Sequence, residues 1–309
     1  MKDIVTLGEV LIDFSPIGKD KNGYNKYLQN PGGAPLNVAC VIGKYGGSAS
    51  FIGKVGNDIF GRFIKEEIEK LSVDTSGLIV DNNHQTTLAF VSLKENGERG
   101  FEFLRKNSAD INLDKKDINI DLIKGARIFH FGSVSMTDEP SLLATLYAKD
   151  EALKNGCLIS CDPNYREMLW EKDKAKKAMG VVLGDVDFLK VSEEEAYILT
   201  GVSDIKRCAS ILKEKVKKIV LITLGEKGVY YKSDLFEGIV NSYKVDVVDT
   251  TGAGDIFYGT FLYEYLIDKV DLLNEESITK ALKKACKAAS LSIMKKGAIP
   301  SIPSLNEID

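Results

Sequence analysis

The sequence predicts an α/β fold with a mostly parallel sheet, because short apolar runs alternate with helical patterns along most of the chain. Continuous apolar runs are typical of parallel strands, which are buried on both faces. Right-handed crossovers join such strands into βαβ units. No linker rich in proline or serine interrupts the alternation, so we expect a single domain over residues 1–309.

The individual elements follow from these two periodicities. Strands are predicted for the apolar runs Ile4–Gly8, Ser50–Val55, Ile128–Phe131, Leu158–Cys161, Phe188–Val191 and Ile219–Thr223. Helices are predicted for Pro35–Tyr45, Ile59–Leu71, Ala253–Asp268 and Ser277–Met294. The first of these helices opens on a proline, which suits a first helical turn, and is closed by Gly46-Gly47.

One pair of strands does not fit the parallel pattern. Residues Thr86–Leu93 and Gly100–Leu104 alternate between apolar and polar side chains and flank Asn96-Gly97, a typical hairpin turn. Alternation leaves one face of a strand for a ligand or a partner subunit. We therefore expect a small β lid in which residues 86–105 join residues 13–30.

Composition excludes several classes of function. The net charge of −4 and the pI of about 5.5 argue against a nucleic-acid binder. No stretch has the length and apolarity of a membrane span, and the N-terminus lacks the layout of a signal peptide. The five cysteines follow neither a disulfide framework nor a zinc motif, so we expect a cytoplasmic protein.

Residues Asp249–Asp255 carry the most specific chemistry in the sequence. Glycines precede a helix there, and glycines allow the backbone and the free N–H groups of a helix start to approach a phosphate. Asp255, in the first helical turn, could accept a proton from a hydroxyl that attacks the phosphoryl group. The alternative is an ordinary glycine-rich helix start in which Asp255 supplies a favourable charge. The pattern is neither a P-loop nor a dinucleotide fingerprint.

Two motifs together resemble the signatures of the ribokinase-like (PfkB) carbohydrate kinases. One is Asp249–Asp255, and the other is Pro31–Ala39, far upstream in the chain. The resemblance extends from Gly8–Asp13 to Gly297–Pro303, and further stretches are similar to the fructokinase branch: Val55–Gly61, Phe129–Ser133 and Asp162–Glu167. The family fold implied is a three-layer α/β/α sandwich with a β lid.

The resemblance implies an ATP-dependent kinase that uses Mg²⁺ and phosphorylates a ketohexose, with D-fructose giving fructose 6-phosphate. A 2-keto-3-deoxygluconate kinase or a ribokinase of the same family is the alternative. A non-catalytic sugar sensor is a second alternative, against which the intact Gly252–Asp255 run argues. A homodimer through the lid is also expected on family grounds, with no membrane or nucleic-acid partner.

The resemblance also assigns roles to single residues. It makes Asp255 the general base and places an anion hole at Gly252, Ala253 and Gly254. The residues that it places around the sugar are Asp13, Gly32, Gly33, Asn37, Phe103, Arg105 and Arg166.

The remaining assignments concern the nucleotide and metal ions. Residues implied to lie near the nucleotide or its Mg²⁺ are Asn164, Lys190, Ser192, Glu195, Thr223, Gly225, Gly228, Cys286 and Ala289. Ser192 and Glu195 also read as a helix capping box, and Ser192 departs from the asparagine common in the family. A K⁺ site is expected in the loops that contain Asp249, Thr251, Ser292, Lys295, Gly297 and Ser301.

Overall fold

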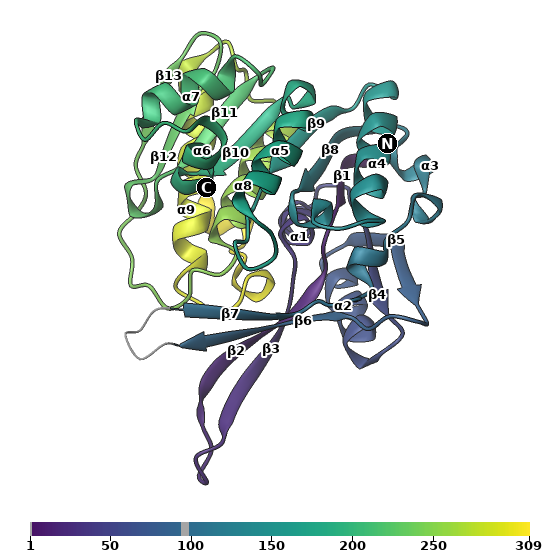
Figure 1. Ribbon diagram of the computed structural model, residues 1–309. Coiled ribbons are helices and arrows are strands. Elements are labelled where there is room, and N and C mark those ends of the chain that lie inside the picture. Colours follow the sequence, from purple (N-terminus) through teal and green to yellow (C-terminus); the bar gives the residue numbers. More distant parts are fainter. Residues whose placement is uncertain (1, 94–98) are drawn as a thin grey trace.

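The computed structural model describes residues 2–93 and 99–309, which form three layers with a twisted sheet between two layers of helices (Figure 1). Within these residues the central sheet has nine strands in the order β13-β12-β11-β10-β9-β8-β1-β4-β5. Only β12 and β13, at one edge, run antiparallel to their neighbours. The predicted α/β fold with a mostly parallel sheet is confirmed. The strands are β1 (Lys2–Leu7), β4 (Ala49–Gly56), β5 (Val73–Asp81), β8 (Ala126–Gly132), β9 (Leu158–Asp162), β10 (Phe188–Ser192), β11 (Ile219–Thr223), β12 (Val229–Lys232) and β13 (Glu237–Val240).

The helices divide between two hydrophobic cores, one on each face of the sheet. The first core contains α1 (Ala34–Lys44), α2 (Ile59–Glu69), α8 (Ala253–Tyr263) and α9 (Glu275–Ser292). The second contains α3 (Ile120–Ile123), α4 (Ser141–Lys154), α5 (Lys172–Val182), α6 (Glu193–Thr200) and α7 (Ile205–Lys213). A short helix, α10 (Leu305–Ile308), ends the chain against α9. No helix of the described residues has both the length and the apolarity that crossing a bilayer requires.

A second, four-stranded sheet lies at the edge of this body, and its strands β2 and β3 extend away from it (Figure 1). Its order is β3-β2-β6-β7, with bounds Asn25–Gly32, Leu11–Lys19, Thr87–Leu93 and Arg99–Leu104. The register places Asp13 opposite both Asn30 and Ala89, and Ala89 opposite Phe103. The predicted Asn96-Gly97 turn lies outside the described residues.

The helix predicted for Ala253–Asp268 is shorter than expected. It is α-helical to Tyr263, and residues Glu264–Asp268 form a π-helical turn. Glu264 is buried in that turn, where its carboxylate accepts a hydrogen bond from Lys284 of α9 at 3.2 Å. The apolar pattern that continues through Leu266 therefore indicates that this stretch is buried. It does not indicate an α-helix, because the π-helical turn also keeps Leu266 buried.

A glycine sets the approach of α1 to α8. A Cβ atom on Gly259 would lie 2.8 Å from Cβ of Val41, so only glycine permits the observed helix spacing. This contact brings Asn37 of α1 to Asp255 of α8, where the two side chains are hydrogen-bonded at 2.7 Å. Two residues that are distant in the sequence thereby meet at the carboxyl ends of the central strands.

Substitution Gly259→Val should therefore lower the free energy of unfolding by about 1–3 kcal/mol, because the extra carbons overpack the α1–α8 contact. Gly180→Val is the matched control: it is also a helical glycine, and a Cβ there meets no atom within 4 Å. Urea unfolding of both variants checks the prediction. Equal stabilities would show that this contact does not set the helix spacing.

Candidate active site

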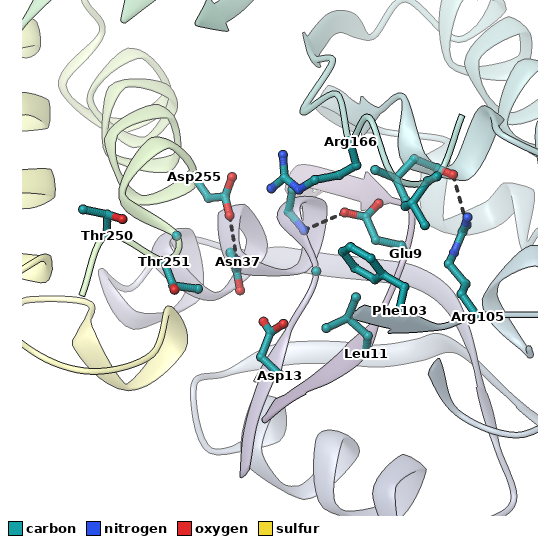
Figure 2. A pocket seen from close by; sticks show the side chains of 15 residues that line it. Glu9, Leu11, Asp13, Asn37, Phe103, Arg105, Arg166, Thr250, Thr251 and Asp255 are labelled. Atoms are coloured by element: carbon teal, nitrogen blue, oxygen red, sulfur yellow. Dashed lines mark hydrogen bonds between the residues drawn. The ribbon is translucent and has the colours of Figure 1, made fainter. Parts of the chain in front are cut away.

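Asp255 occupies the first turn of α8, directly after the helix start at Gly252. Its side chain is buried, and each carboxylate oxygen accepts a hydrogen bond from an asparagine amide. Figure 2 shows the bond from Asn37. Asn37 donates to Oδ2 at 2.7 Å, and Asn164 donates to Oδ1 at 3.0 Å. Burial raises the pKa of Asp255 to about 6, and the charge of Asp162 adds to this, while Lys190 opposes it. A carboxylate with this pKa is ionised at neutral pH and can still accept a proton.

Both glycines of the turn in front of Asp255 have a close neighbour, and the first also has a left-handed backbone. Gly252 has a φ of 76°, and a Cβ there would lie 2.4 Å from Cβ of Ala298. A Cβ on Gly254 would lie 2.8 Å from Nζ of Lys190. The first N–H groups of a helix have no intrahelical acceptor. With glycines at both positions, an anion can approach these N–H groups and the Lys190 ammonium together.

Lys190 and Asp162 form a buried ion pair behind this turn. Nζ lies 2.8 Å from Oδ2, and both side chains are more than nine-tenths buried. Asp162 ends β9, and Lys190 lies in the adjacent parallel strand β10, directly after Leu189, which pairs with Cys161; this register explains why the two residues meet. Although burial alone would lower it, the pKa of Lys190 is raised, because the charges of Asp162, Glu195 and Asp255 favour the ammonium form.

A cavity of about 310 Å³ opens in front of Asp255. The sequence singled out most of the residues that line it, although they come from elements far apart in the chain. Those it singled out are Asp13, Gly33, Asn37, Phe103, Arg105, Arg166, Thr251, Gly252 and Asp255. Those it gave no role are Glu9, Leu11, Ala34, Val134, Leu169 and Thr250.

The register of the second sheet explains how Asp13 and Phe103 reach the same cavity. Asp13, Ala89 and Phe103 are consecutive cross-strand neighbours, so their side chains share one face of the sheet. The small Ala89 lies between the two larger side chains. Gly32 supports the row, because a Cβ there would lie 2.6 Å from Oδ2 of Asp13.

The charged groups of this cavity differ in how firmly they are held. Arg105 is buried, and its guanidinium donates to Asp110 at 2.7 Å, to Thr137 at 2.8 Å and to the Val134 carbonyl at 3.0 Å. Arg166 is exposed and donates to the backbone carbonyls of Asn164 and Tyr165. The conformation of Arg105 is therefore fixed by the protein, whereas Arg166 can turn toward a bound anion.

Two carboxyl groups of the cavity have strongly raised pKa values. Burial raises the pKa of Asp13 to about 7, against the influence of Arg166. Burial likewise raises the pKa of Glu9 to about 7, although Glu9 accepts a hydrogen bond from the Ala34 N–H at 2.8 Å. Glu9 follows the first strand directly, and its position among apolar residues was the signal in the sequence that could have identified it.

A second cavity, of about 790 Å³, lies on the other side of the Gly252 turn and has the size of a small-molecule site. Thr250 lines both cavities, so the two meet at the start of α8. Of the residues implied to contact a nucleotide, Gly225 and Ala289 line it. Its full lining is Gly225, Glu226, Lys227, Ser242, Tyr243, Lys244, Val245, Val247, Thr250, Ala253, Ala289, Ser290 and Ile293.

Three other residues assigned to the nucleotide do not line this cavity. Cys286 is buried in the hydrophobic core of α9. The Thr223 hydroxyl donates to the Val191 carbonyl at 3.3 Å. Gly228 has a φ of 99°, and a Cβ there would lie 2.0 Å from the carbonyl oxygen of Val240, so this glycine is required by the turn between β11 and β12.

The capping box predicted at the start of α6 is present. The Ser192 hydroxyl accepts from the Glu195 N–H at 3.2 Å, and Oε2 of Glu195 accepts from the Ser192 N–H at 2.7 Å. Oε1 of Glu195 also accepts from the Tyr165 N–H at 2.6 Å. Glu195 therefore fixes the loop after β9 to the start of α6.

Asp249 joins the two loops in which the sequence predicts a K⁺ site. Its Oδ1 accepts from the N–H of Thr251 at 2.9 Å, and its Oδ2 accepts from the N–H of Gly297 at 3.1 Å. Lys295 N–H closes the turn on the carbonyl of Ser292 at 3.0 Å, and the Ser301 hydroxyl donates to the carbonyl of Ala298 at 2.8 Å. The part of the chain that the structure describes contains no cluster of three His, Cys, Asp or Glu side chains suited to a metal ion.

The comparisons with known proteins agree with this geometry. The model of the pfkB family carbohydrate kinases matches residues 1–305. The chain belongs to this family. It is 40% identical over 309 residues to fructokinase-1 of Zea mays, an alignment that covers 99% of this chain and 96% of that protein.

Solved structures of family members superpose closely. Fructokinase from Xylella fastidiosa with bound ATP is 30% identical, with a TM-score of 0.88, and covers 100% of this chain and 97% of that one. A double mutant of the Vibrio cholerae fructokinase, bound to fructose, ADP and potassium, is 34% identical, with a TM-score of 0.89 and the same coverage. The predicted enzyme class, a carbohydrate kinase, is confirmed.

Substitution Lys190→Met should lower the free energy of unfolding of this protein by about 3–5 kcal/mol, because it leaves the Asp162 carboxylate buried without its cation. Adding Asp162→Asn should recover part of that loss. The control is Lys154→Met, which breaks an exposed pair with Glu151 at 2.7 Å and should change stability by about 0.5 kcal/mol or less. Urea unfolding at neutral pH measures these three variants and Asp162→Asn alone. Additive effects of Lys190→Met and Asp162→Asn would contradict the pairing.

Proposed function

We propose that the chain is an ATP-dependent fructokinase, which transfers the γ-phosphoryl group of ATP to a hydroxyl of D-fructose to give fructose 6-phosphate. The observation that carries this proposal is that two cavities meet at the Gly252–Asp255 turn. A sugar in the smaller cavity and a nucleotide in the larger one would present their reacting groups to the same buried carboxylate. The fructokinase relatives support fructose as the sugar.

In the proposed mechanism, Asp255 accepts the proton of the attacking hydroxyl. The N–H groups at the start of α8 stabilise the negative charge that develops on the transferring phosphoryl oxygens. Lys190 lies against Gly254 and adds a cation at the same place. Arg166 lies at the mouth of the cavity and can turn toward the phosphoryl group.

We assign the sugar contacts to residues with unused acceptor or donor capacity. Oδ1 of Asn37 is buried and has no hydrogen-bond partner within the described residues, so it can accept from a sugar hydroxyl. Asp13 is a second acceptor, and Phe103 covers the sugar from the same row of the second sheet. This sheet would then act as a lid that excludes water, which would otherwise hydrolyse ATP.

Two metal ions belong to the proposal. Mg²⁺, when bound, supplies charge neutralisation between the phosphates and is held mainly by phosphate oxygens and water. Glu195 fits a role through water, because each of its oxygens accepts one backbone N–H and retains a further lone pair. K⁺ would be held by carbonyl oxygens of the loops that Asp249 joins, as the potassium-bound Vibrio structure supports.

We also propose a cytoplasmic homodimer. All five cysteines are free and buried, as expected in a reducing compartment. On the extended β2–β3 hairpin, Tyr24, Ile17, Tyr27 and Leu28 are exposed, with Tyr24 at 73%. Apolar side chains on a projecting sheet suit contact with a second copy of the chain.

Substitution Asp255→Asn should lower kcat by at least about 10²-fold, because the amide cannot accept the proton. Asp246→Asn is the matched control, since Asp246 is exposed and lines neither cavity. The rate is measured as ADP release, and circular dichroism verifies the fold of both variants. A nearly wild-type rate for Asp255→Asn would overturn the proposed mechanism.

The substrate assignment is tested by ADP release with ATP and Mg²⁺ against fructose, ribose, 2-keto-3-deoxygluconate, adenosine and fructose 6-phosphate. Fructose should give the highest kcat/KM, and replacing K⁺ by a bulky organic cation should lower the rate. Preference for another sugar would contradict the fructose assignment but keep the kinase chemistry. A rate that does not depend on K⁺ would remove the cation site.

A further inference from the structure

Asn164 has a left-handed backbone conformation, which is uncommon for residues other than glycine. Its φ is 48°, in the left-handed region, and its side chain is buried at 8% exposure. Such a conformation costs free energy for any residue with a Cβ, although asparagine tolerates it better than most. A residue keeps a strained backbone conformation only where the surrounding structure holds it in place. Residues with such conformations are more frequent at functional sites than elsewhere.

Four contacts from different elements hold the turn around Asn164. Its own N–H donates to Oδ1 of Asp162 at 3.2 Å, and Asp162 is fixed in turn by Lys190. The Pro163 carbonyl accepts from the N–H of Ser133 at 2.9 Å, and the Tyr165 N–H donates to Glu195. The turn is thus anchored to the end of β8, to β10 and to the start of α6.

The strained turn presents the Asn164 amide to Asp255. Nδ2 of Asn164 lies 3.0 Å from Oδ1, while Asn37 reaches the other oxygen from α1. The two amides therefore hold the carboxylate from two separate elements and fix its rotation. Each carboxylate oxygen keeps a second lone pair, so both hydrogen bonds can persist while a substrate hydroxyl approaches.

We propose that Asn164 is a positioning residue, whose amide orients the carboxylate of Asp255 and stabilises its ionised form for proton transfer. This inference rests on the proposed function, in which Asp255 is the general base. It differs from the role that the family resemblance implies for Asn164, which is a place near the phosphates. The two roles predict different kinetic defects.

Other charged groups around Asp255 also affect how readily its carboxyl group ionises. Asp162 and Asp13 oppose ionisation of Asp255, whereas Lys190 and Arg166 favour it. A hydrogen bond donated to the charged form lowers a pKa, so losing the Asn164 amide raises the pKa of Asp255. The acid limb of the pH–rate profile must then move to higher pH, and activity at a fixed acidic pH must fall.

The test uses Asn164→Gly, which allows the left-handed backbone and removes the side chain together with its amide. We expect kcat at the pH plateau to fall about tenfold and the acid limb of kcat/KM to move up by about one pH unit, as expected for loss of one hydrogen bond to a charged group. The KM for fructose and the Kd for ADP, measured by calorimetry, should not change. Asn164→Asp should move the limb further in the same direction, because it places a second carboxylate beside Asp255.

Asn107→Gly is the matched control, since Asn107 also has a left-handed φ, of 56°, but is exposed. Its kcat, the acid limb of its kcat/KM profile, its KM for fructose and its Kd for ADP should equal those of the unaltered protein. If Asn164→Gly does not fold, Asn164→Asp alone tests the shift of the limb. A weaker ADP affinity with an unmoved acid limb would overturn the proposal and favour a phosphate-binding role. Asp255→Asn, assayed in parallel, separates the general-base role of Asp255 from the positioning role of Asn164. An active Asp255→Asn variant refutes the general-base role. An inactive Asp255→Asn variant, together with unaltered kinetics of Asn164→Gly, refutes only the positioning role.

Discussion

The arrangement of this site depends on one constraint, which is that an ionisable carboxylate is buried at the start of a helix. A buried charge is unfavourable unless donors and cations compensate for it. Asp255 obtains this compensation from the positive end of α8, from two asparagine amides and from Lys190. Because these groups come from α1, the loop after β9 and strand β10, several elements must meet around a single residue at this edge of the sheet.

Lys190 illustrates how the same compensation serves two purposes. Its ammonium balances the buried Asp162 carboxylate and also lies against the backbone of Gly254. In a surrounding of low dielectric constant, a cation held in this way attracts a phosphoryl group more strongly than an exposed lysine does. The protein therefore stabilises its own fold and prepares the anion site with a single ion pair, and a substitution at Lys190 disturbs both.

The sequence predicted the elements with the clearest periodicity and the motifs with unusual local geometry. The buried strands and the glycines around Asp255 are of this kind, because burial and backbone conformation are largely local demands. It did not reveal β5, β12 or β13, whose apolar runs are short or interrupted by polar residues. Nor did the sequence predict the hydrogen-bond partners of the buried polar side chains. Arg105 lines the cavity in front of Asp255, but its hydrogen bonds to Asp110 and Thr137 were not predicted, nor was the hydrogen bond from Asn164 to Asp255. Which polar groups come within hydrogen-bond distance depends on contacts between distant parts of the chain. The Gly259–Val41 contact is an example, and no local sequence pattern predicts it.

The second sheet approaches the Gly252 turn at a second place outside the cavity, through the Asn30 side chain and the loop that contains Gly297. Asn30 lies opposite Asp13 in the sheet, and a Cβ on Gly297 would lie 2.8 Å from Oδ1 of Asn30. The next residue, Ala298, is the neighbour that excludes any side chain at Gly252. A slip of one residue in the sheet register would turn Asp13 and Phe103 away from the cavity and would remove Asn30 from Gly297. The register of the second sheet and the shape of the Gly252 turn are therefore constrained together, so in the proposed mechanism a lid that closes over the sugar meets an anion hole already in place.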